Sequence, residues 1–178
     1  FKKSTYLNLV KYETEDQISD NIVEYIESIP IGGKIYFRED LSLVGNTKDN
    51  TYQYRDEIES ALIAHPINPS DVELIALAIE NTDPYKTKIS RLAIQYSSLV
   101  EILTTMNVPF AIAGRHTEFL NGVSHISETF KGLDQEGTDE IILLSAVVQM
   151  QDVLASVSES VGYIQVFFDI IEDETVFN

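Results

Sequence analysis

Four side chains in the second half of the chain have types and spacings that could bind a ligand: His116, Asn121, His125 and Tyr163. An imidazole can exchange a proton near neutral pH, and an amide or a phenol can orient a polar group. A small apolar molecule or a lipid could be held between helices around His116 and Tyr163. Asn121 and His125 are four residues apart, so they share a helix face and could form a polar cluster near Glu118.

The same residues have a structural interpretation, which we favour. His116 lies on an apolar seam between Ile112 and Phe119, where a partly buried histidine is usually hydrogen-bonded across the bundle. A solvated helix face accounts for Asn121 and His125 equally well. Under this interpretation the residues stabilise the fold, and none of them is assigned a catalytic role.

Several site chemistries are excluded by what the sequence lacks. Cysteine is absent, which excludes disulfides, thiolate metal sites and thiol nucleophiles. No histidine has a glutamate three residues before it, as a di-metal site in a helical bundle requires. The tripeptide His116-Thr117-Glu118 matches the H-x-E of zinc deaminases, but their second motif needs cysteines. Phosphate-binding and hydrolase motifs are also missing, so we expect no metal, no cofactor and no enzymatic activity.

The charge of the chain restricts its partners. Lys and Arg number 12 against 29 Asp and Glu, which makes the net charge −17 and the isoelectric point about 4.3. Nucleic acids bind mainly through basic groups, so we expect no nucleic-acid partner. The carboxylates are scattered between apolar positions, which favours a solvated acidic surface over imitation of a nucleic acid. A hydrolase that uses some of these carboxylates is a weaker alternative.

The first half of the chain predicts short helices and one irregular stretch. The pattern T-x-x-Q at residues 14–17 is a capping box, and the helix that it begins is ended by Pro30. In residues 31–50 the helical period is lost, and Ile35, Phe37, Leu41 and Leu43 alternate with more polar neighbours. This alternation predicts a short hairpin or an irregular excursion. Two shorter helices should follow at Thr51–His65 and Pro69–Asn81.

The second half predicts three longer helices with apolar residues at steps of three and four. They begin near Pro84, near Ile112 and at Thr138, and the last carries a seven-residue repeat over four heptads. Their seam residues are Ile89, Leu92, Tyr96, Leu99, Leu103 and Met106; then Ile112, His116, Phe119, Val123, Ile126, Phe130 and Leu133; then Leu143, Val147, Met150, Leu154, Val157, Val161, Ile164, Phe168 and Ile171. Short connections favour antiparallel neighbours, so the predicted fold is an all-α antiparallel helical bundle with long C-terminal helices.

Two further features of these helices predict how they pack. Gly122 and Gly162 fall in helix interiors, where glycine is unfavourable, so we expect close helix approach at both positions. The apolar stripe of the last helix is broadened by Ile141, Ile142, Leu144, Val148 and Val153. A stripe this wide is typical of a helix with several neighbours, which favours a bundle over a two-stranded coiled coil.

We expect residues 1–178 to form a single helical domain. Within it, residues 13–82 carry the shorter helices and the loop, and residues 83–173 form the core of the bundle. No run of about 18 apolar residues is present, so we predict no transmembrane helix in this sequence. The basic start Phe1-Lys2-Lys3, within residues 1–12, could be a membrane-proximal stub, the remnant of a cleaved signal or a boundary without meaning.

From about Ile89 onward the sequence resembles uncharacterised helical proteins of candidate phyla radiation (Patescibacteria) bacteria. The resemblance rests on residues 106–109, on His116 with residues 120–122 and Ser124, and on the long final helix. It implies an exported protein of the cell envelope or surface, tethered near its N-terminus, while a cytoplasmic location stays open. It implies no activity, substrate or catalytic residue.

Together these observations predict a non-enzymatic cell-envelope domain that acts as a protein-interaction or structural module. Its partner would be another protein or a second copy of the chain. A small-molecule or lipid binding module that uses the bundle core is the alternative, and a carboxylate-dependent hydrolase is the weaker one.

Overall fold

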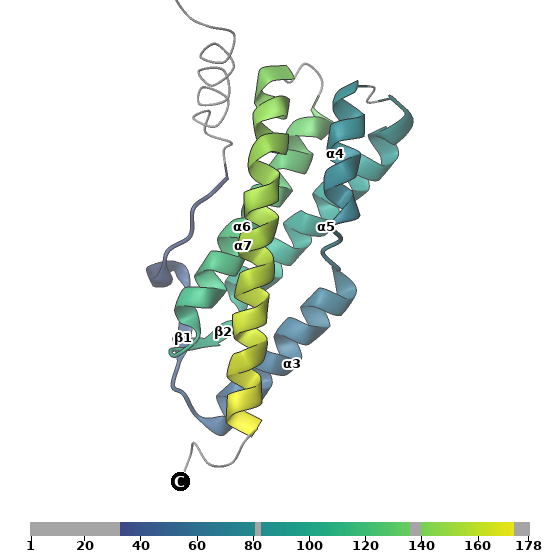
Figure 1. Cartoon of the computed structure of the whole chain (residues 1–178). Helices are drawn as coiled ribbons and strands as arrows, with labels where there is room; N and C mark the ends of the chain where they lie inside the picture. The colour runs from purple at the N-terminus through teal and green to yellow at the C-terminus, as the bar shows by residue number, and fades with distance from the viewer. Residues whose placement is uncertain (1–32, 81–82, 136–139, 173–178) are drawn as a thin grey trace, which may run out of the picture.

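The computed structural model describes residues 33–80, 83–135 and 140–172. The helix predicted to begin at Thr14 and the cap predicted at Thr138 lie outside these residues. The described chain is an all-α helical bundle, as predicted (Figure 1). Its α-helices are α3 (Lys48–Ala64), α4 (Ser70–Glu80), α5 (Lys86–Thr105), α6 (Ala113–Asp134) and α7 (Glu140–Glu172). The shorter elements are η1 (Arg38–Asp40), β1 (Ser42–Val44), η2 (Asp83–Tyr85) and β2 (Asn107–Pro109).

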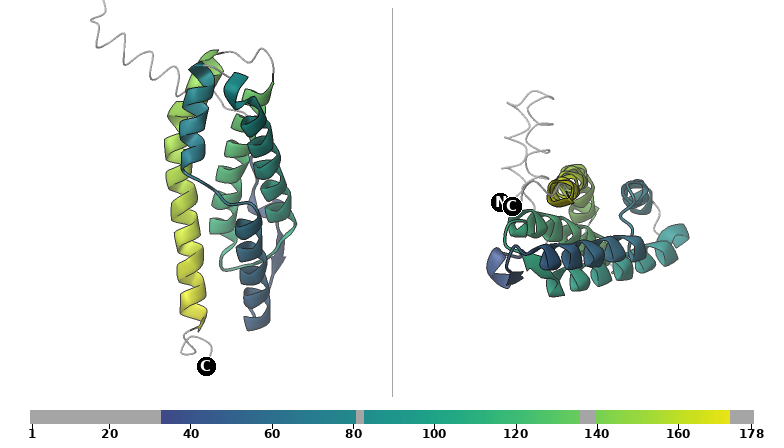
Figure 2. Two further views of the ribbon diagram at one scale, coloured as in Figure 1. Left: turned by 90° about the vertical axis from the view of Figure 1, so that its right-hand side faces the viewer. Right: turned by 90° about the horizontal axis from the view of Figure 1, so that it is seen from below.

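The helix α6 is the centre of the arrangement. It packs antiparallel against α5 and, on another side, against α7. The shorter helices α3 and α4 follow one another along α7, with α4 beside its N-terminal half and α3 beside its C-terminal half (Figure 1). Figure 2 shows α4 and α7 together on one side of the α5–α6 pair. The two largest interfaces are therefore those that α6 makes.

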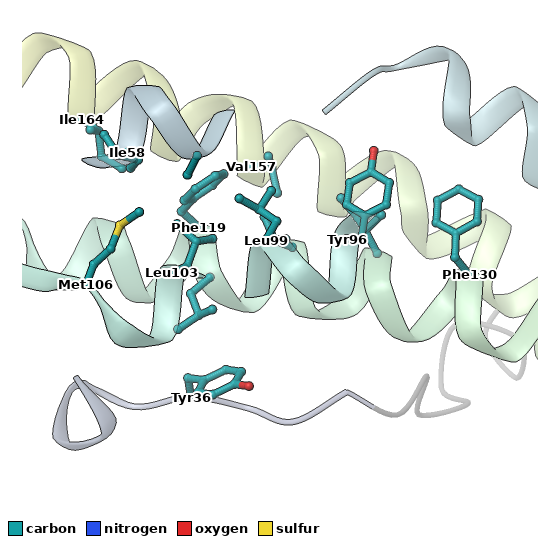
Figure 3. Close-up of a cluster of buried hydrophobic side chains, with 14 of the residues drawn as sticks. Tyr36, Ile58, Tyr96, Leu99, Leu103, Met106, Phe119, Phe130, Val157 and Ile164 are labelled. Carbon is teal, nitrogen blue, oxygen red and sulfur yellow. The ribbon is translucent and has the colours of Figure 1, made fainter. Parts of the chain in front are cut away.

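The predicted seams form the core. Every predicted seam residue of α5 and of the segment that becomes α6 is buried, from Ile89 to Met106 and from Ile112 to Leu133. On α7, Met150, Val157, Ile164, Phe168 and Ile171 are buried, and Leu154 and Val161 are partly buried. The side chains of Leu143 and Val147 are outside what the structure describes. Figure 3 shows part of this core, in which Ile58 of α3 lies beside Ile164 of α7.

The starts of α3 and α4 follow from local hydrogen bonding. The Thr47 hydroxyl accepts a hydrogen bond from the Asn50 N–H at 3.2 Å, so α3 begins three residues earlier than predicted. The Asn68 side chain accepts from the Ser70 N–H at 3.1 Å, as expected of an N-cap before Pro69. These caps satisfy backbone donors that the first helical turn leaves unpaired.

The excursion before α3 is irregular and is not a hairpin. Its strand β1 pairs in parallel with β2, so that Leu43 lies opposite Val108. The helices α3 to α5 separate the two strands in the sequence. Ile35 and Phe37 are 67% and 61% exposed, whereas Tyr36 between them is buried. Burial does alternate along this segment, but Tyr36 is the buried residue and Ile35 and Phe37 are the exposed ones. The reason is that the segment packs on α6 through Tyr36 and not on a second local strand (Figure 3).

Only one of the two mid-helix glycines marks a close approach. A Cβ built on Gly122 would overlap Cγ2 of Val157, so α6 and α7 could not approach this closely with any larger residue. At Gly162 a Cβ would meet nothing within 4 Å, which contradicts the prediction made for that position. Gly162 lies on the exposed side of α7, away from α6.

The broad apolar stripe of α7 is only partly covered by other described helices: Val153 packs against the core. Ile141, Leu144 and Val148 are 48%, 44% and 38% exposed, although we expected further helices to bury them. The segment Val148–Ile171 has a mean hydropathy of 1.3. By length and composition only, it is long and apolar enough to cross a bilayer. It also packs its buried side along α6, and it carries acidic residues at Asp152, Glu159 and Asp169.

The contact at Gly122 predicts opposite effects for two matched substitutions. Gly122→Ala should lower the free energy of unfolding by about 1–3 kcal/mol, because the new methyl group overlaps Val157. Gly162→Ala should raise it by up to about 1 kcal/mol, because alanine favours a helix and the space is open. Urea denaturation followed by circular dichroism measures both. Adding Val157→Ala should restore part of the stability that Gly122→Ala removes, because the overlapping side chain becomes smaller. If Gly122→Ala instead raises the free energy of unfolding, the close approach of α6 and α7 at this position is contradicted.

Candidate functional site

The described residue most able to do acid–base chemistry, His116, is enclosed in the core. Its side chain is fully buried, and both ring nitrogens have partners. Nε2 lies 3.0 Å from the carbonyl oxygen of Leu103 on α5, and Nδ1 lies 3.0 Å from the hydroxyl of Tyr54 on α3. The Tyr54 ring also meets the imidazole edge-on, with centroids 5.7 Å apart. His116 therefore joins α3, α5 and α6 at one buried point.

The partners of His116 determine its protonation. A carbonyl oxygen can only accept, so Nε2 carries the hydrogen and donates it to Leu103. The lone pair of Nδ1 then accepts the hydrogen bond that the Tyr54 hydroxyl donates. Burial lowers the pKa of His116 to about 4, and burial also raises the pKa of Tyr54. The ring is neutral at physiological pH, with no nitrogen free to act on a substrate.

The side-chain amide of Asn121 binds the segment before β1 with the two hydrogen bonds that a backbone peptide group would make. Its Oδ1 accepts from the Tyr36 N–H at 2.8 Å, and its Nδ2 donates to the Tyr36 carbonyl at 3.0 Å. One turn later, Ser124 donates to the carbonyl of Lys34 at 3.1 Å. The amide thus supplies the hydrogen bonds that a neighbouring strand would otherwise supply to Tyr36. This explains how Tyr36 is held against α6 without a paired strand.

His125 is half-enclosed on the same helix. Its Nε2 is buried and has no hydrogen-bond partner among the described residues. Burial lowers the pKa of His125, so the neutral ring is favoured. Asn121 is engaged with Tyr36, and Glu118 with Arg115 at 2.7 Å. The polar cluster named as the alternative for Asn121, His125 and Glu118 is therefore not formed by hydrogen bonds within the described residues, and the favoured solvated face does not describe the buried Nε2 of His125.

Tyr163 lies on the surface of α7 and not beside His116. It is 45% exposed, and the Arg115 guanidinium of α6 stacks 3.9 Å from the centre of its ring. The hydrogen bond to Glu118 raises the pKa of Arg115, so this cation is permanent. The arrangement ties the edges of α6 and α7 together. A ligand could not contact both the buried His116 and the surface ring of Tyr163 in one cavity.

The sequence analysis missed a second buried polar pair. The Tyr96 hydroxyl of α5 donates to Oδ2 of Asp71 at 3.0 Å, and Asp71 is only 5% exposed. Burial, and then the charge of Asp71, raise the pKa of Tyr96. Asp71 stands in the first turn of α4, where the helix dipole favours a negative charge. That N-terminal position is the signal that could have identified it.

Two prominent hollows of the described surface are not lined by any of the four predicted residues. One, of about 870 Å³, lies between α3 and the end of α5 and includes Asp56 and Glu57. These neighbours diverge by about 100° around the helix, and Glu57 accepts from Gln53 at 2.8 Å. Across the described ranges, no three His, Asp or Glu residues are grouped as metal ligands.

The other hollow is mainly apolar. It has a volume of about 560 Å³ and lies between the α3–α4 connection and the middle of α7. Leu62, Pro66 and Ile67 line one wall, and Leu154 and Val161 line the other. This hollow opens beside α7 and not around His116, where the sequence placed the candidate ligand.

The most distinctive surface feature is the outer face of α7, defined by half-exposed apolar side chains that share one side of the helix. They are Ile141, Leu144, Val148, Tyr163, Val166 and Ile170, between 38% and 51% exposed. At 100° per residue they fall within an arc of roughly 100°. On this face Asp152, Ala155, Ser156 and Glu159 separate two groups of exposed apolar residues, residues 141–148 and residues 163–170. Isolated exposed apolar residues are ordinary, but a cluster of them marks an interaction surface.

The depressed pKa of His116 predicts a pH-dependent stability. The unfolded chain binds a proton on this ring near pH 6.5, whereas the folded protein binds it near pH 4. The free energy of unfolding should therefore fall as the pH drops between these values, by up to about 3 kcal/mol. His116→Gln should abolish this part of the slope, as measured by urea denaturation at a series of pH values.

A matched variant separates titration from packing. Tyr54→Phe leaves Nδ1 of His116 unpaired, so it should cost about 1–3 kcal/mol at neutral pH while the slope remains. If His116→Gln and the unsubstituted protein lose stability equally between pH 6.5 and pH 4, the assignment of the slope to His116 is wrong.

Comparison of the chain with protein-family models, curated proteins and solved structures finds no match. The resemblance to helical envelope proteins therefore stays a prediction.

Proposed function

We propose that this chain is a non-enzymatic protein-interaction module whose docking surface is the outer face of α7. The observation that supports the proposal most strongly is the apolar stripe on that face, in a chain of net charge −17. Exposing apolar surface of this extent to water costs free energy. That free energy is regained when a partner covers the surface.

The charge distribution favours a protein over other occupants. Asp152 and Glu159 lie within the stripe, and a carboxylate inside a bilayer is expensive. The acidic net charge also opposes binding to anionic lipids and nucleic acids. At a protein interface such carboxylates can stay solvated in the polar rim, which the hydrocarbon core of a bilayer does not allow.

The state of the candidate chemical groups supports a non-enzymatic role. His116 has no free nitrogen, and Tyr54, its nearest proton donor, is held in the same buried hydrogen bond. The extracytoplasmic setting implied by the family resemblance is part of the proposal, since an acidic, cysteine-free exterior is compatible with it.

A photo-crosslinking experiment tests the docking surface. A photoreactive residue at Val166 should yield a discrete protein adduct in cells, because Val166 is 51% exposed in the middle of an apolar patch. The matched control is Ile94 of α5, an isolated apolar residue that is 68% exposed. Adding Val148→Asp should weaken the Val166 adduct at least severalfold. Equal crosslinking from Val166 and Ile94 would contradict the proposal.

The apolar hollow beside α7 supports a second candidate function, the binding of a small apolar molecule. Its walls, which include Leu62 and Val161, offer mainly apolar contacts in a volume of about 560 Å³, within the range of ligand sites. Native mass spectrometry should then detect a co-purified apolar molecule that is lost on Val161→Lys. A ligand-free spectrum, and no retention of added fatty acids, would dispose of this candidate.

A further inference from the structure

The segment before β1 follows α6 in a definite direction. Tyr36 is held by Asn121. A Cβ built on Gly33 would lie 3.4 Å from the hydroxyl of Ser124 and 3.6 Å from the side chain of Glu128. As the residue number falls from 36 to 33, the contacts therefore move toward the C-terminal end of α6. The point at which residues 1–32 join the described chain faces that end.

The same end of the bundle carries the N-terminal part of α7. The two helices are antiparallel, and Gly122 of α6 lies against Val157 of α7. Each residue further along α6 is therefore level with one residue earlier on α7, so that Asp134 is level with Ser145. The distance from residues 124–128, beside Gly33, to this level is about 9–15 Å at 1.5 Å per residue. Residues 30–32 span about 10 Å when extended, which brings the residues before Pro30 within reach of Ser145.

Ser145 is fully buried on a side of α7 that the described helices leave open. Ser156, three turns later and only about 20° away around the helix, is exposed. Both serines lie on one side of Val157, whereas Leu154 and Val161 lie on the other side, where the α3–α4 connection meets α7. The helix α6 runs beside both serines, so it does not account for the difference. A cover is needed over Ser145 and not over Ser156.

The sequence supplies an apolar segment at the right distance. A helix is predicted from the capping box at residues 14–17 to Pro30, and its apolar side carries Ile18, Ile22, Tyr25, Ile26 and Ile29. Ile141, which is 48% exposed, lies about 40° from Ser145 and one turn before it. An apolar cover over Ser145 would therefore bury Ile141 as well. A segment tethered nearby has a high effective concentration, which favours it over a free partner.

We propose that the apolar side of residues 22–29 docks on the N-terminal part of α7, over Ser145 and Ile141 of the same chain. The contact continues the attachment to α6 that Asn121 and Ser124 begin. It goes beyond the proposed function, because it lies at the edge between α6 and α7. The exposed apolar group at residues 163–170 stays open to a partner.

Thiol labelling of the full chain tests this docking, because the protein has no cysteine of its own. Ser145→Cys and Ser156→Cys each introduce one thiol with little change in side-chain volume. The Ser145→Cys thiol should react with a maleimide at least about tenfold more slowly than the Ser156→Cys thiol, because it must wait for a local opening. Equal rates would overturn the proposal.

A matched pair of substitutions identifies the cover. Ile22→Asp places a carboxylate on the apolar side of residues 14–29, and Val23→Asp places one about 100° away from it. Because burying a carboxylate is costly, Ile22→Asp should raise the labelling rate of Ser145→Cys at least about tenfold. Ile26→Asp should have the same effect. Val23→Asp should leave this rate unchanged, and none of the three should alter the rate of Ser156→Cys.

A third thiol reports on the bundle itself. Ser160 is only 1% exposed, so Ser160→Cys should stay unreactive in every variant. If Ile22→Asp releases Ser160→Cys as fully as Ser145→Cys, the segment is not a separate docking element and the proposal is overturned. If Ser145→Cys stays protected in both Ile22→Asp and Ile26→Asp, the connection between α6 and α7 is its cover, and the proposal is likewise overturned.

Dilution distinguishes a cover within the chain from one supplied by a second copy. Protection of Ser145→Cys should be the same at about 100 μM and about 1 μM, because an intramolecular contact does not depend on concentration. Protection that is lost on dilution would overturn the proposal. The crosslinking test at Val166 is independent of these outcomes, since Val166 belongs to the group at residues 163–170.

Discussion

The enclosure of α6 on three sides is the constraint on which the rest of the fold depends. Gly122 lets α7 approach on one side, because no side chain separates the helix from Val157. On a second side Ser127 forms a 3.0 Å hydrogen bond with Ser97 of α5, and on a third Ser124 holds the segment before β1. Small or hydrogen-bonding residues at these contacts allow close packing, which larger apolar residues would prevent.

The chain uses its buried polar groups for this packing. Burying an imidazole, a phenol or a carboxylate is expensive unless each polar atom has a partner. His116 joins three helices through Tyr54 and Leu103, and Tyr96 joins α5 to α4 through Asp71. The side chains best suited to chemistry are thereby engaged inside the bundle. The apolar surface left on α7 is the feature that these interactions do not explain.

Much of the fold could be predicted from the sequence. The seam from Ile89 to Met106 and the seam through Phe119 are buried as predicted, because a period of three and four places such residues on one helix face. For residues 31–50 the sequence predicts a short hairpin or an irregular excursion, and the irregular form is observed, since β1 pairs with β2 and Asn121, far along the chain, holds Tyr36. Contacts at such separation leave no local pattern in the sequence.

The candidate site was predicted less well. The structural role favoured for His116 agrees with its buried hydrogen bonds, but the cluster with His125 and the pairing with Tyr163 do not form. The sequence by itself determined the approximate extent of each described helix and which side of the long helices is apolar, because both depend on spacing along one chain segment. Only the tertiary structure decided that His116 is enclosed and that Gly122 but not Gly162 is a contact. It also decided that half of the stripe on α7 faces water, because a periodic pattern states that a face is apolar and not how many neighbours cover it.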